Sequence, residues 1–485
     1  MTPGNVLVLM SDEHNPKLLG AAGHPFIVTP NLDALAARGT RFTSAYTACP
    51  ICVPARAAFA VGRYVNEIGY WDNADAYDGA IPSWHHALRE SGHCVVSIGK
   101  LHFRGLPGDD HGFSREIVPM HVVEGIGDVK GLVRENIPTR KGGDKMAKRA
   151  GPGETTYTAY DRDIAARAQV WLHEEAPRLR DTPWVLFVSF VLPHFPLTAP
   201  PHWFYHYWQQ DLPLPKRYPK AERPKHPYLS MYEHTVDYDS HFGTPDDVKR
   251  AVAGYAGLVS AMDENVGRVL GALRDAGLED ATRVIYTSDH GDNAGARGLW
   301  GKSTLYEESA GVPLIVAGHD VGRGLVVDTP VSHIDCAPTI LLAAGEPPRV
   351  GGRDLPGASL FDVAQGARPA RPVISEYHAI GSIGGAYMIR VGRYKYCHYV
   401  AHPPQLFDLA SDPEELADLA GDARFAEVVA ECERRLRAVL DPEEVDARAK
   451  RRQEELLARH GGREAALARG DLGFTPAPGT AAEMN

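Results

Sequence analysis

Two groups of acidic residues and histidines in the chain have side chains that suit a metal ion. Asp12 and Glu13 directly follow an apolar run near the N-terminus, and Asp289 and His290 follow a second one. Carboxylate oxygens with one imidazole are ligands that Ca²⁺, Mg²⁺ or Mn²⁺ take in proteins. An Asp after a strand can also cap a turn, but the polar cluster at 288–292 is harder to explain by capping. We therefore predict a divalent metal site from these four residues.

The segment Cys52-Val53-Pro54-Ala55-Arg56 is the sharpest chemical feature of the sequence. Pro54 fits the first turn of a helix, so a helix is expected to begin here. Arg56 lies four residues after Cys52 and would return to the same helix face. Backbone N–H groups and the helix dipole favour an anion at such a position, which predicts a lowered thiol pKa. The alternative is a small apolar core cysteine, the commoner role of a buried thiol.

Basic side chains follow further strand-like runs. Lys100 and His102 come after the run 94–99, His194 comes after the most apolar run of the chain, and Lys302 lies in a glycine-rich turn. Strand ends in an open α/β sheet converge on one edge, where ligands bind, so these places together predict one shared active site. The alternatives are a loop histidine at 194 and a solvated surface charge at 302.

Apolar runs and helical patterns alternate along the chain. This alternation is typical of an α/β fold with a large, mainly parallel sheet and helices on both faces. One helix carries end signals, with Thr29 as its cap, Pro30 at its first position and Gly39 at a left-handed C-terminal position. Strands are predicted at 5–11, 40–46, 94–99, 184–192, within 283–291 and at 312–318, and further helices at about 54–61, 82–91, 157–178, 246–276 and 333–344.

Three units are predicted along the chain. A catalytic unit spans 1–365, a small antiparallel sheet with a helix spans 366–441, and a charged helical tail with a flexible end spans 442–485. Within the first unit, 104–155 has weak periodicity, which is typical of an insertion or lid, and 193–245 is a long irregular excursion. Tails of this kind can wrap a neighbouring subunit, so we expect a homo-oligomer in which the tail edges a neighbour's pocket. A solvated helix is an equally natural alternative.

The composition excludes several classes of function. With 51 Lys and Arg against 62 Asp and Glu, the formal net charge is −11. The chain therefore lacks the basic surface that binds nucleic acid or anionic membranes without specificity. No run approaches about 18 consecutive apolar residues, so no membrane span is predicted. Residues 1–10 fit a first strand rather than a secretion signal, and the six cysteines form no zinc set or disulfide framework. We expect a cytoplasmic enzyme.

The order of these motifs resembles the type I, formylglycine-dependent sulfatase family of the alkaline phosphatase superfamily. The resemblance centres on Cys-x-Pro-x-Arg at 52–56 and covers about residues 5–410. The segments 71–73 and 298–300 and the helical tail are most similar to the choline-sulfatase and phosphonate monoester hydrolase branch. The other matching segments are Asp12 after the first strand, 29–33, 99–102, 193–196, 287–291, 301–302 with 306–307, and 406–408.

This resemblance implies a cofactor and a role for each candidate residue. A formylglycine-generating enzyme would convert Cys52 into formylglycine, whose hydrate attacks the sulfur of a small anionic ester. One divalent metal is implied, Ca²⁺ with Mn²⁺ or Mg²⁺ as alternatives, and His102 would be the base that regenerates the aldehyde. The implied metal ligands are Asp12, Glu13, Cys52, Asp289 and His290. Arg56 and Lys100 would bind the charged ester, and His194 and Lys302 would face the leaving oxygen. The residues that would contact the rest of the substrate are Asn73, Trp71 and Trp300.

Three functions follow as hypotheses. The first is hydrolysis of small aryl or alkyl sulfate esters. The second is hydrolysis of phosphonate monoesters or phosphodiesters by the same machinery, because a sulfate monoester and a phosphodiester each carry one negative charge. The third is a degenerate binding protein, which would lack some of the site residues, yet the metal and nucleophile positions are all filled.

Overall fold

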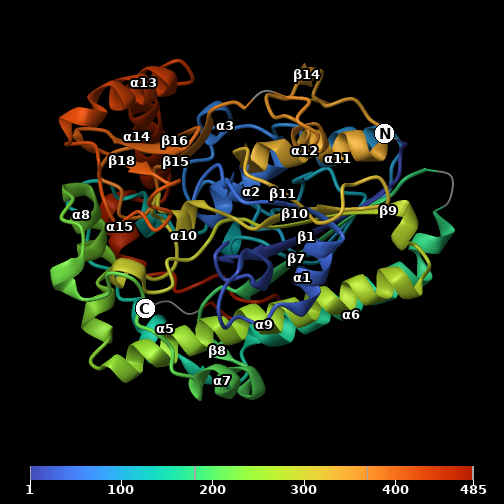
Figure 1. Cartoon of the computed structure of the whole chain (residues 1–485), viewed down its shortest axis with the longest axis horizontal. Helices are drawn as coiled ribbons and strands as arrows, with labels where there is room; N and C mark the ends of the chain where they lie inside the picture. Colours follow the sequence, from blue (N-terminus) through green and yellow to red (C-terminus); the bar gives the residue numbers. More distant parts are fainter. Residues whose placement is uncertain (1, 180–181, 369, 483–485) are drawn as a thin grey trace.

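The computed structural model describes residues 2–179, 182–368 and 370–482. A central sheet runs through it, with five neighbouring parallel strands at one side and an antiparallel strand, β10, beyond them (Figure 1). The predicted α/β fold with a mainly parallel sheet is therefore confirmed. In spatial order the strands are β11 (Leu325–Val327), β2 (Gly39–Phe42), β10 (Leu314–Ala317), β9 (Thr282–Ser288), β1 (Asn5–Asp12), β7 (Val185–Pro193), β4 (Val95–Lys100) and β5 (Arg115–Met120).

Side chains of β1 alternate between two hydrophobic cores. Val6, Val8 and Met10 belong to the core on one face, and Leu7 and Leu9 belong to the core on the other, as the two-residue period of a strand requires. Because helices cover both faces, the strands are continuous apolar runs. The first face carries α2 (Cys52–Val61), α4 (Trp84–Glu90) and α11 (Cys336–Ala344), and the second carries α1 (Pro30–Ala37), α6 (Thr156–Glu174) and α9 (Pro245–Asp275) (Figure 1).

A second, antiparallel sheet follows the large one in the sequence, as expected, and one helix packs against it. Its buried side chains belong to the same hydrophobic core as α2 and α11, so this unit extends the core of the first face. Its elements are β15 (Val373–Tyr377), β16 (Ala386–Val391), β17 (Tyr394–Tyr399), β18 (His402–Asp408) and the helix α13 (Ala426–Arg437).

The structure differs from three local expectations. The segment 193–245 was expected to be irregular, but it contains the helices α7 (Pro201–Trp208) and α8 (Pro227–Val236). Gly39 does not end a helix in the left-handed region; it begins β2, where an added Cβ would lie 2.4 Å from the carbonyl oxygen of Val316. The segment 104–155 is more ordered than a lid, since it supplies β5 at the edge of the sheet. The remaining elements are β3 (Ala45–Tyr46), α3 (Val65–Ile68), α5 (Asp144–Ala147), β6 (Gly151–Pro152), β8 (Thr198–Ala199), α10 (Glu307–Ala310), β12 (Val331–Ser332), β13 (Arg349–Val350), β14 (Arg353–Asp354) and α12 (Leu360–Ala364).

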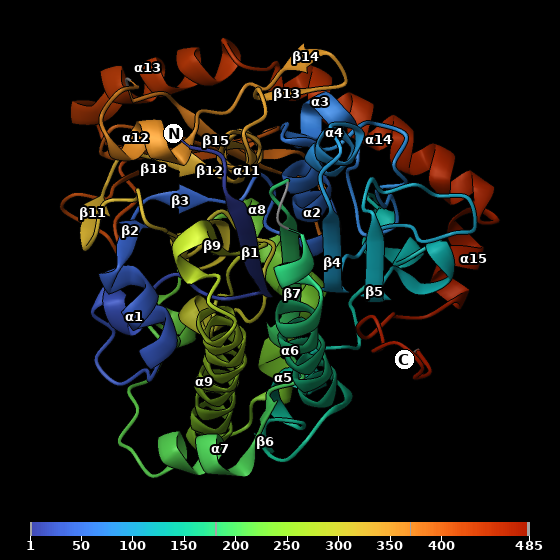
Figure 2. The ribbon, with the colours of Figure 1, turned by 90° about the vertical axis from the view of Figure 1, so that its right-hand side faces the viewer.

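The C-terminal tail packs on its own chain. It forms α14 (Pro442–Arg459) and α15 (Gly462–Ala468), which lie beside the β5 edge of the large sheet (Figure 2). A buried ion pair of 3.0 Å between Arg134 and Asp446 joins α14 to the 104–155 segment. Residues 471–475 then line a pocket of the same chain, where we expected the tail to edge a neighbour's pocket. Among the residues that the structure describes, no helix is long and apolar enough to cross a membrane.

Candidate active site

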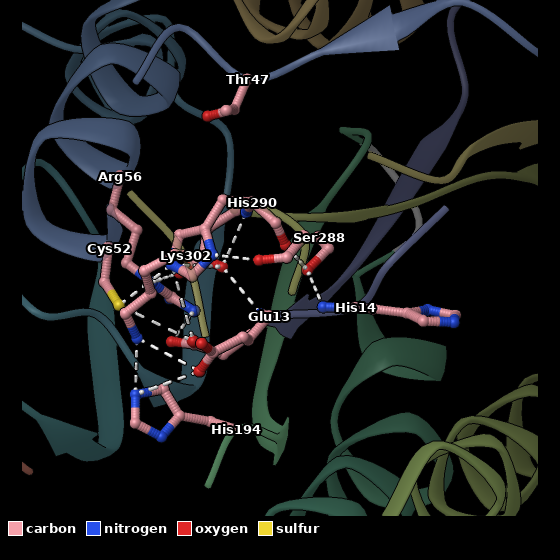
Figure 3. A network of polar contacts seen from close by, with 12 residues as sticks. Glu13, His14, Thr47, Cys52, Arg56, His194, Ser288, His290 and Lys302 are labelled. Atoms are coloured by element: carbon pink, nitrogen blue, oxygen red, sulfur yellow. Dashed lines mark hydrogen bonds and ion pairs between the residues drawn. The ribbon is translucent and has the colours of Figure 1, made fainter. Parts of the chain in front are cut away.

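The predicted reactive residues converge at one edge of the large sheet. The carboxyl ends of β1, β4, β7 and β9 meet there, and α2 begins there (Figure 3). The close packing that the sequence predicted is therefore present. The residues that the structure brings together are Asp12, Glu13, Cys52, Arg56, Lys100, His102, His194, Asp289, His290 and Lys302.

Cys52 is the first residue of α2 and is buried, with 2% of its surface exposed. Its Sγ lies 3.2 Å from Nε2 of His290 and 3.7 Å from Oδ1 of Asp12. Burial and the carboxylate of Asp12 raise the pKa of the thiol to about 11. The lowered pKa expected from the helix start is therefore wrong, because the helix dipole is outweighed by burial and by the acidic neighbour. An unmodified Cys52 stays a neutral thiol at neutral pH, before any metal binds.

Arg56 returns to the same side of α2 as Cys52, as the spacing predicted, and points at the strand ends (Figure 3). Its Nε donates to Oδ2 of Asp289 at 2.8 Å, and its Nη2 lies 3.3 Å from Oδ2 of Asp12. Nη1 donates to the carbonyl of Lys100 at 2.7 Å and to Oγ of Ser189 at 2.9 Å. The guanidinium thus joins the ends of four strands, β1, β4, β7 and β9, at the base of the site.

Asp12 is held ionised although it is fully buried. Burial alone would raise its pKa, but Lys100, which forms an ion pair with it, and the cations around it hold the pKa well below its ordinary value. A buried carboxylate needs such partners, since an unpaired charge in the interior is costly. The site therefore presents a preformed negative group beside Cys52.

Four side chains form a set that fits a divalent cation. Ligand atoms of Asp12, Cys52, Asp289 and His290 all lie within 4.8 Å of one another, and all four residues are buried. Nδ1 of His290 lies 2.9 Å from the carbonyl oxygen of Gly291 and must donate to it. The lone pair of Nε2 is therefore on the side of Cys52, in the arrangement that metal-binding histidines use.

Glu13 belongs to a second group rather than to this set. Its backbone is in the left-handed region, with φ of 72°, a strained conformation for a residue with a side chain. This turn carries the carboxylate toward Lys302, whose Nζ lies 3.2 Å from Oε2, and toward His194 at 3.4 Å. Burial raises the pKa of Glu13 well above its ordinary value. The structure thus groups Glu13 with Asp12 and His194, whose ligand atoms lie within 4.8 Å of one another, and not with Cys52, Asp289 and His290.

Lys302 and His194 form a hydrogen-bonded pair beside the metal-binding set (Figure 3). Nδ1 of His194 lies 2.7 Å from the carbonyl of Phe195 and carries the proton. Nε2 therefore accepts, and Nζ of Lys302 donates to it at 2.8 Å. Burial and the charge of Lys302 hold the pKa of His194 well below its ordinary value. Burial alone would lower the pKa of Lys302, but Cys52, Glu13 and Asp12 raise it, so the proton of this pair resides on Lys302.

His102 is a neutral imidazole with one free nitrogen. Its Nε2 lies 2.7 Å from Oγ1 of Thr475, a residue of the tail, and its buried Nδ1 has no hydrogen-bond partner among the described residues. Burial and the charge of Lys100 hold its pKa well below the ordinary value. The ring can therefore accept a proton in the pocket that it lines with Cys52.

A cavity of about 150 Å³ opens onto Cys52, His102, His194 and Lys302. Asn73 lines it as predicted, and its Oδ1 accepts from the backbone N–H of Val53 at 3.2 Å, next to Cys52.

Trp71 and Trp300 do not line this cavity. Trp71 packs edge-on against His378, and Trp300 stacks on Phe242 with 5.0 Å between ring centroids. Both are core residues, so the structure places neither tryptophan at the cavity where substrate contact was predicted for them. Sequence reasoning missed other lining residues because they belong to segments without periodicity; they include Lys145, Tyr232, Tyr238, Phe474 and Thr475.

Comparisons with known proteins agree with this arrangement. A family model described as Sulfatase matches residues 4–346, and one described as N-sulphoglucosamine sulphohydrolase, C-terminal, matches residues 295–441. The choline-sulfatase of Rhizobium meliloti (strain 1021) is 34% identical over 441 residues, which cover 87% of this chain and 84% of the relative. Arylsulfatase K of Bos taurus is 31% identical over 468 residues, covering 91% and 83%. The crystal structure of the phosphonate monoester hydrolase of Agrobacterium radiobacter superposes with a TM-score of 0.73 at 25% identity, covering 90% of this chain and 95% of that chain.

Proposed function

Since the chain belongs to the sulfatase family, we propose that it hydrolyses small aryl or alkyl sulfate esters with a formylglycine made from Cys52. The observation that carries this proposal is the position of Cys52. Its side chain lies at the floor of the cavity and faces both the metal-binding set and the Lys302–His194 pair. A nucleophile there can be activated from one side while the leaving oxygen is protonated from the other.

Two properties of residue 52 favour its conversion to formylglycine. The raised thiol pKa of about 11 makes the thiol a poor nucleophile at neutral pH. In addition, sulfur is a soft donor, whereas the carboxylates of Asp12 and Asp289 are hard ones. A hydrate oxygen at residue 52 would give a donor set that suits Ca²⁺, Mn²⁺ or Mg²⁺ better than a thiol does. A formylglycine-generating enzyme is the partner that this conversion needs.

The reaction then proceeds in two steps. One hydroxyl of the hydrate would attack sulfur and release its proton to water. The bond between sulfur and the ester oxygen would break, and the alcohol would leave with a proton from the Lys302–His194 pair, which regains one from water. His102 next removes the proton of the second hydroxyl. The carbon–oxygen bond to the sulfate then breaks, sulfate leaves and the aldehyde forms again, ready to be hydrated.

The surrounding charges support both steps. A divalent cation held by Asp12, Asp289, His290 and residue 52 would supply positive charge that stabilises anionic oxygens. Arg56 and Lys100 form ion pairs with the carboxylates of that set and hold them in place. The positive charge on Lys302 faces the ester oxygen, where negative charge develops.

A second activity is favoured by the structural comparison. The likeness to the phosphonate monoester hydrolase supports turnover of phosphonate monoesters or phosphodiesters at the same site. These substrates carry the single negative charge of a sulfate ester and need no different machinery.

Mass spectrometry and kinetics test the proposal together. The peptide that contains residue 52 should carry the mass of formylglycine, and the Cys52→Ala variant should lose turnover of aryl sulfates. An unmodified thiol in a fully active preparation would exclude the formylglycine mechanism. Turnover of aryl sulfate, phosphonate monoester and phosphodiester should be compared in the same preparation; negligible sulfate turnover beside the phosphorus esters would make the second activity the principal one.

A further inference from the structure

The cavity of the active site contains a buried lysine that the proposed reaction does not use. Lys145, in α5, is 2% exposed and lines the cavity together with Cys52 and Lys302. Within the described part of the chain, its ammonium has neither a carboxylate partner nor a hydrogen-bond acceptor. A buried ammonium without a counter-ion is costly, so its place in a substrate cavity calls for an explanation.

The other charged side chains near Lys145 are already matched. Arg140 lies 2.7 Å from the carboxylate of Asp128 and 3.2 Å from that of Asp471. Lys130 lies 2.7 Å from Asp471. These two acids and two bases cancel in formal charge, and Asp144 and Arg149, the other charged neighbours of Lys145, act on its pKa in opposite directions. Burial lowers the pKa of Lys145 to about 8, although the carboxylate of Asp144 raises it. Lys145 thus has no ion-pair partner of its own among the described residues.

The aromatic side chains of this wall are unsuited to a cationic alcohol. Nζ of Lys145 lies 5.4 Å from the ring centroid of Phe474 and 6.0 Å from that of Phe195. Nζ of Lys302 lies 5.1 Å from the same Phe195 ring. The faces of Phe195 and Phe474, which could attract a quaternary ammonium, are thus already next to lysine ammonium groups, which would repel it.

We propose that the alcohol part of the natural substrate carries a second anionic group, a carboxylate or a second sulfate, and that Lys145 binds it. This inference rests on the proposed function, because it describes the far end of a substrate whose reacting ester lies at residue 52. Both ends share one cavity of about 150 Å³, so a substrate held by its sulfate at Lys302 extends toward Lys145. Binding supplies the counter-ion that the folded chain lacks.

Three matched aryl sulfates test the inference. They carry a carboxylate, a neutral carboxamide or a trimethylammonium group at the same ring position. We expect the wild-type kcat/KM to be highest for the carboxylate, about tenfold above the carboxamide, and lowest for the trimethylammonium compound. In Lys145→Met the ratio of carboxylate to carboxamide should fall to about one, whereas Lys145→Arg should keep most of the preference.

The controls separate this inference from the proposed function. Lys148→Met, in the exposed residue that follows α5, should leave the ratio unchanged. Lys145→Met removes a buried unpaired charge, so it should fold, and circular dichroism checks this. A wild-type enzyme that turns over all three compounds without preference, or a Lys145→Met variant that retains the carboxylate preference, would overturn the inference alone. Absence of turnover for every aryl sulfate, including the unsubstituted one, would instead refute the proposed function.

Discussion

The hydroxyl of Thr475 should matter for the second half of the reaction. It lies 2.7 Å from Nε2 of His102 and is the one described partner of that ring, because Nδ1 has none. Thr475→Val keeps the shape of the side chain and removes the hydrogen bond. The backbone carbonyl of Thr475, which accepts from Tyr157, is unchanged.

Two magnitudes follow from this geometry. A buried ring nitrogen left without a partner costs ~1–3 kcal/mol of folding free energy, which urea denaturation can measure. If the freed ring loses about 1.4 kcal/mol of transition-state stabilisation, the step that His102 serves slows about tenfold. That step is removal of sulfate from the enzyme, whereas release of the alcohol precedes it.

The assay therefore monitors both products. With Thr475→Val, we expect a rapid burst of alcohol equal to the enzyme concentration, a slow steady state, and a sulfate adduct on the peptide of residue 52 after acid quench. Thr480→Val is the matched control, since this exposed threonine of the same tail donates only to the carbonyl of Ala477. A variant that loses stability but shows neither burst nor adduct would refute the role of His102 as a base held by the tail.

Three further predictions concern the buried charges. Arg56→Met leaves the carboxylates of Asp12 and Asp289 without their guanidinium partner and should lower the free energy of unfolding in urea by ~3–5 kcal/mol. Arg63→Met, in a partly exposed i,i+4 pair, should change this free energy little. A similar loss in both variants would contradict the argument. Removing metal with EDTA should abolish activity and lower the thermal midpoint of unfolding. Adding Ca²⁺ or Mn²⁺ at a hundred times its Kd should then restore ~2.7 kcal/mol of unfolding free energy. If the metal stabilises Asp289→Asn as much as the wild type, it binds at another site. Burial raises the pKa of Glu376 to about 8, so between about pH 4.5 and 8 the folded chain keeps a proton that the unfolded chain has lost, and stability falls as the pH rises through this window. Glu376→Gln should therefore be more stable than the wild type at pH 8 by ~1.4 kcal/mol or more and as stable as the wild type near pH 4. Glu427→Gln, at an exposed position, is the control. A Glu376→Gln variant that is less stable than the wild type at pH 8 would contradict the predicted direction of the pH dependence.

Most of the candidate active-site residues could be predicted from the sequence because they stand at or directly after the end of a strand or in the first turns of a helix; Lys302, in a glycine-rich turn, is the exception. Their place in the chain determines the edge of the sheet to which they belong, and their type determines their chemistry. The pKa of Cys52 could not be predicted in the same way, since it depends on burial by segments far away in the sequence. The positions of Trp71 and Trp300 could not be predicted for a similar reason. An aromatic side chain beside a motif can either pack in the core or contact a ligand.

The end of the cavity at Lys145 could not be predicted for a different reason. Lys145 and Phe474 come from segments without hydrophobic periodicity that lie far apart in the sequence and meet only in the folded chain. No local pattern marks a lysine that will lack a counter-ion. The same holds for Gly39, whose role depends on the carbonyl of a strand that lies far along the chain.

The position of Cys52 also bears on when it could be converted. Cys52 is 2% exposed in the folded chain, so on the formylglycine proposal a converting enzyme would reach it before α2 is packed. Residue 52 leaves the ribosome well before residues 471–475, which line the cavity. The thiol would then be open to oxidation before this part of the cavity wall is complete, and maturation would precede turnover.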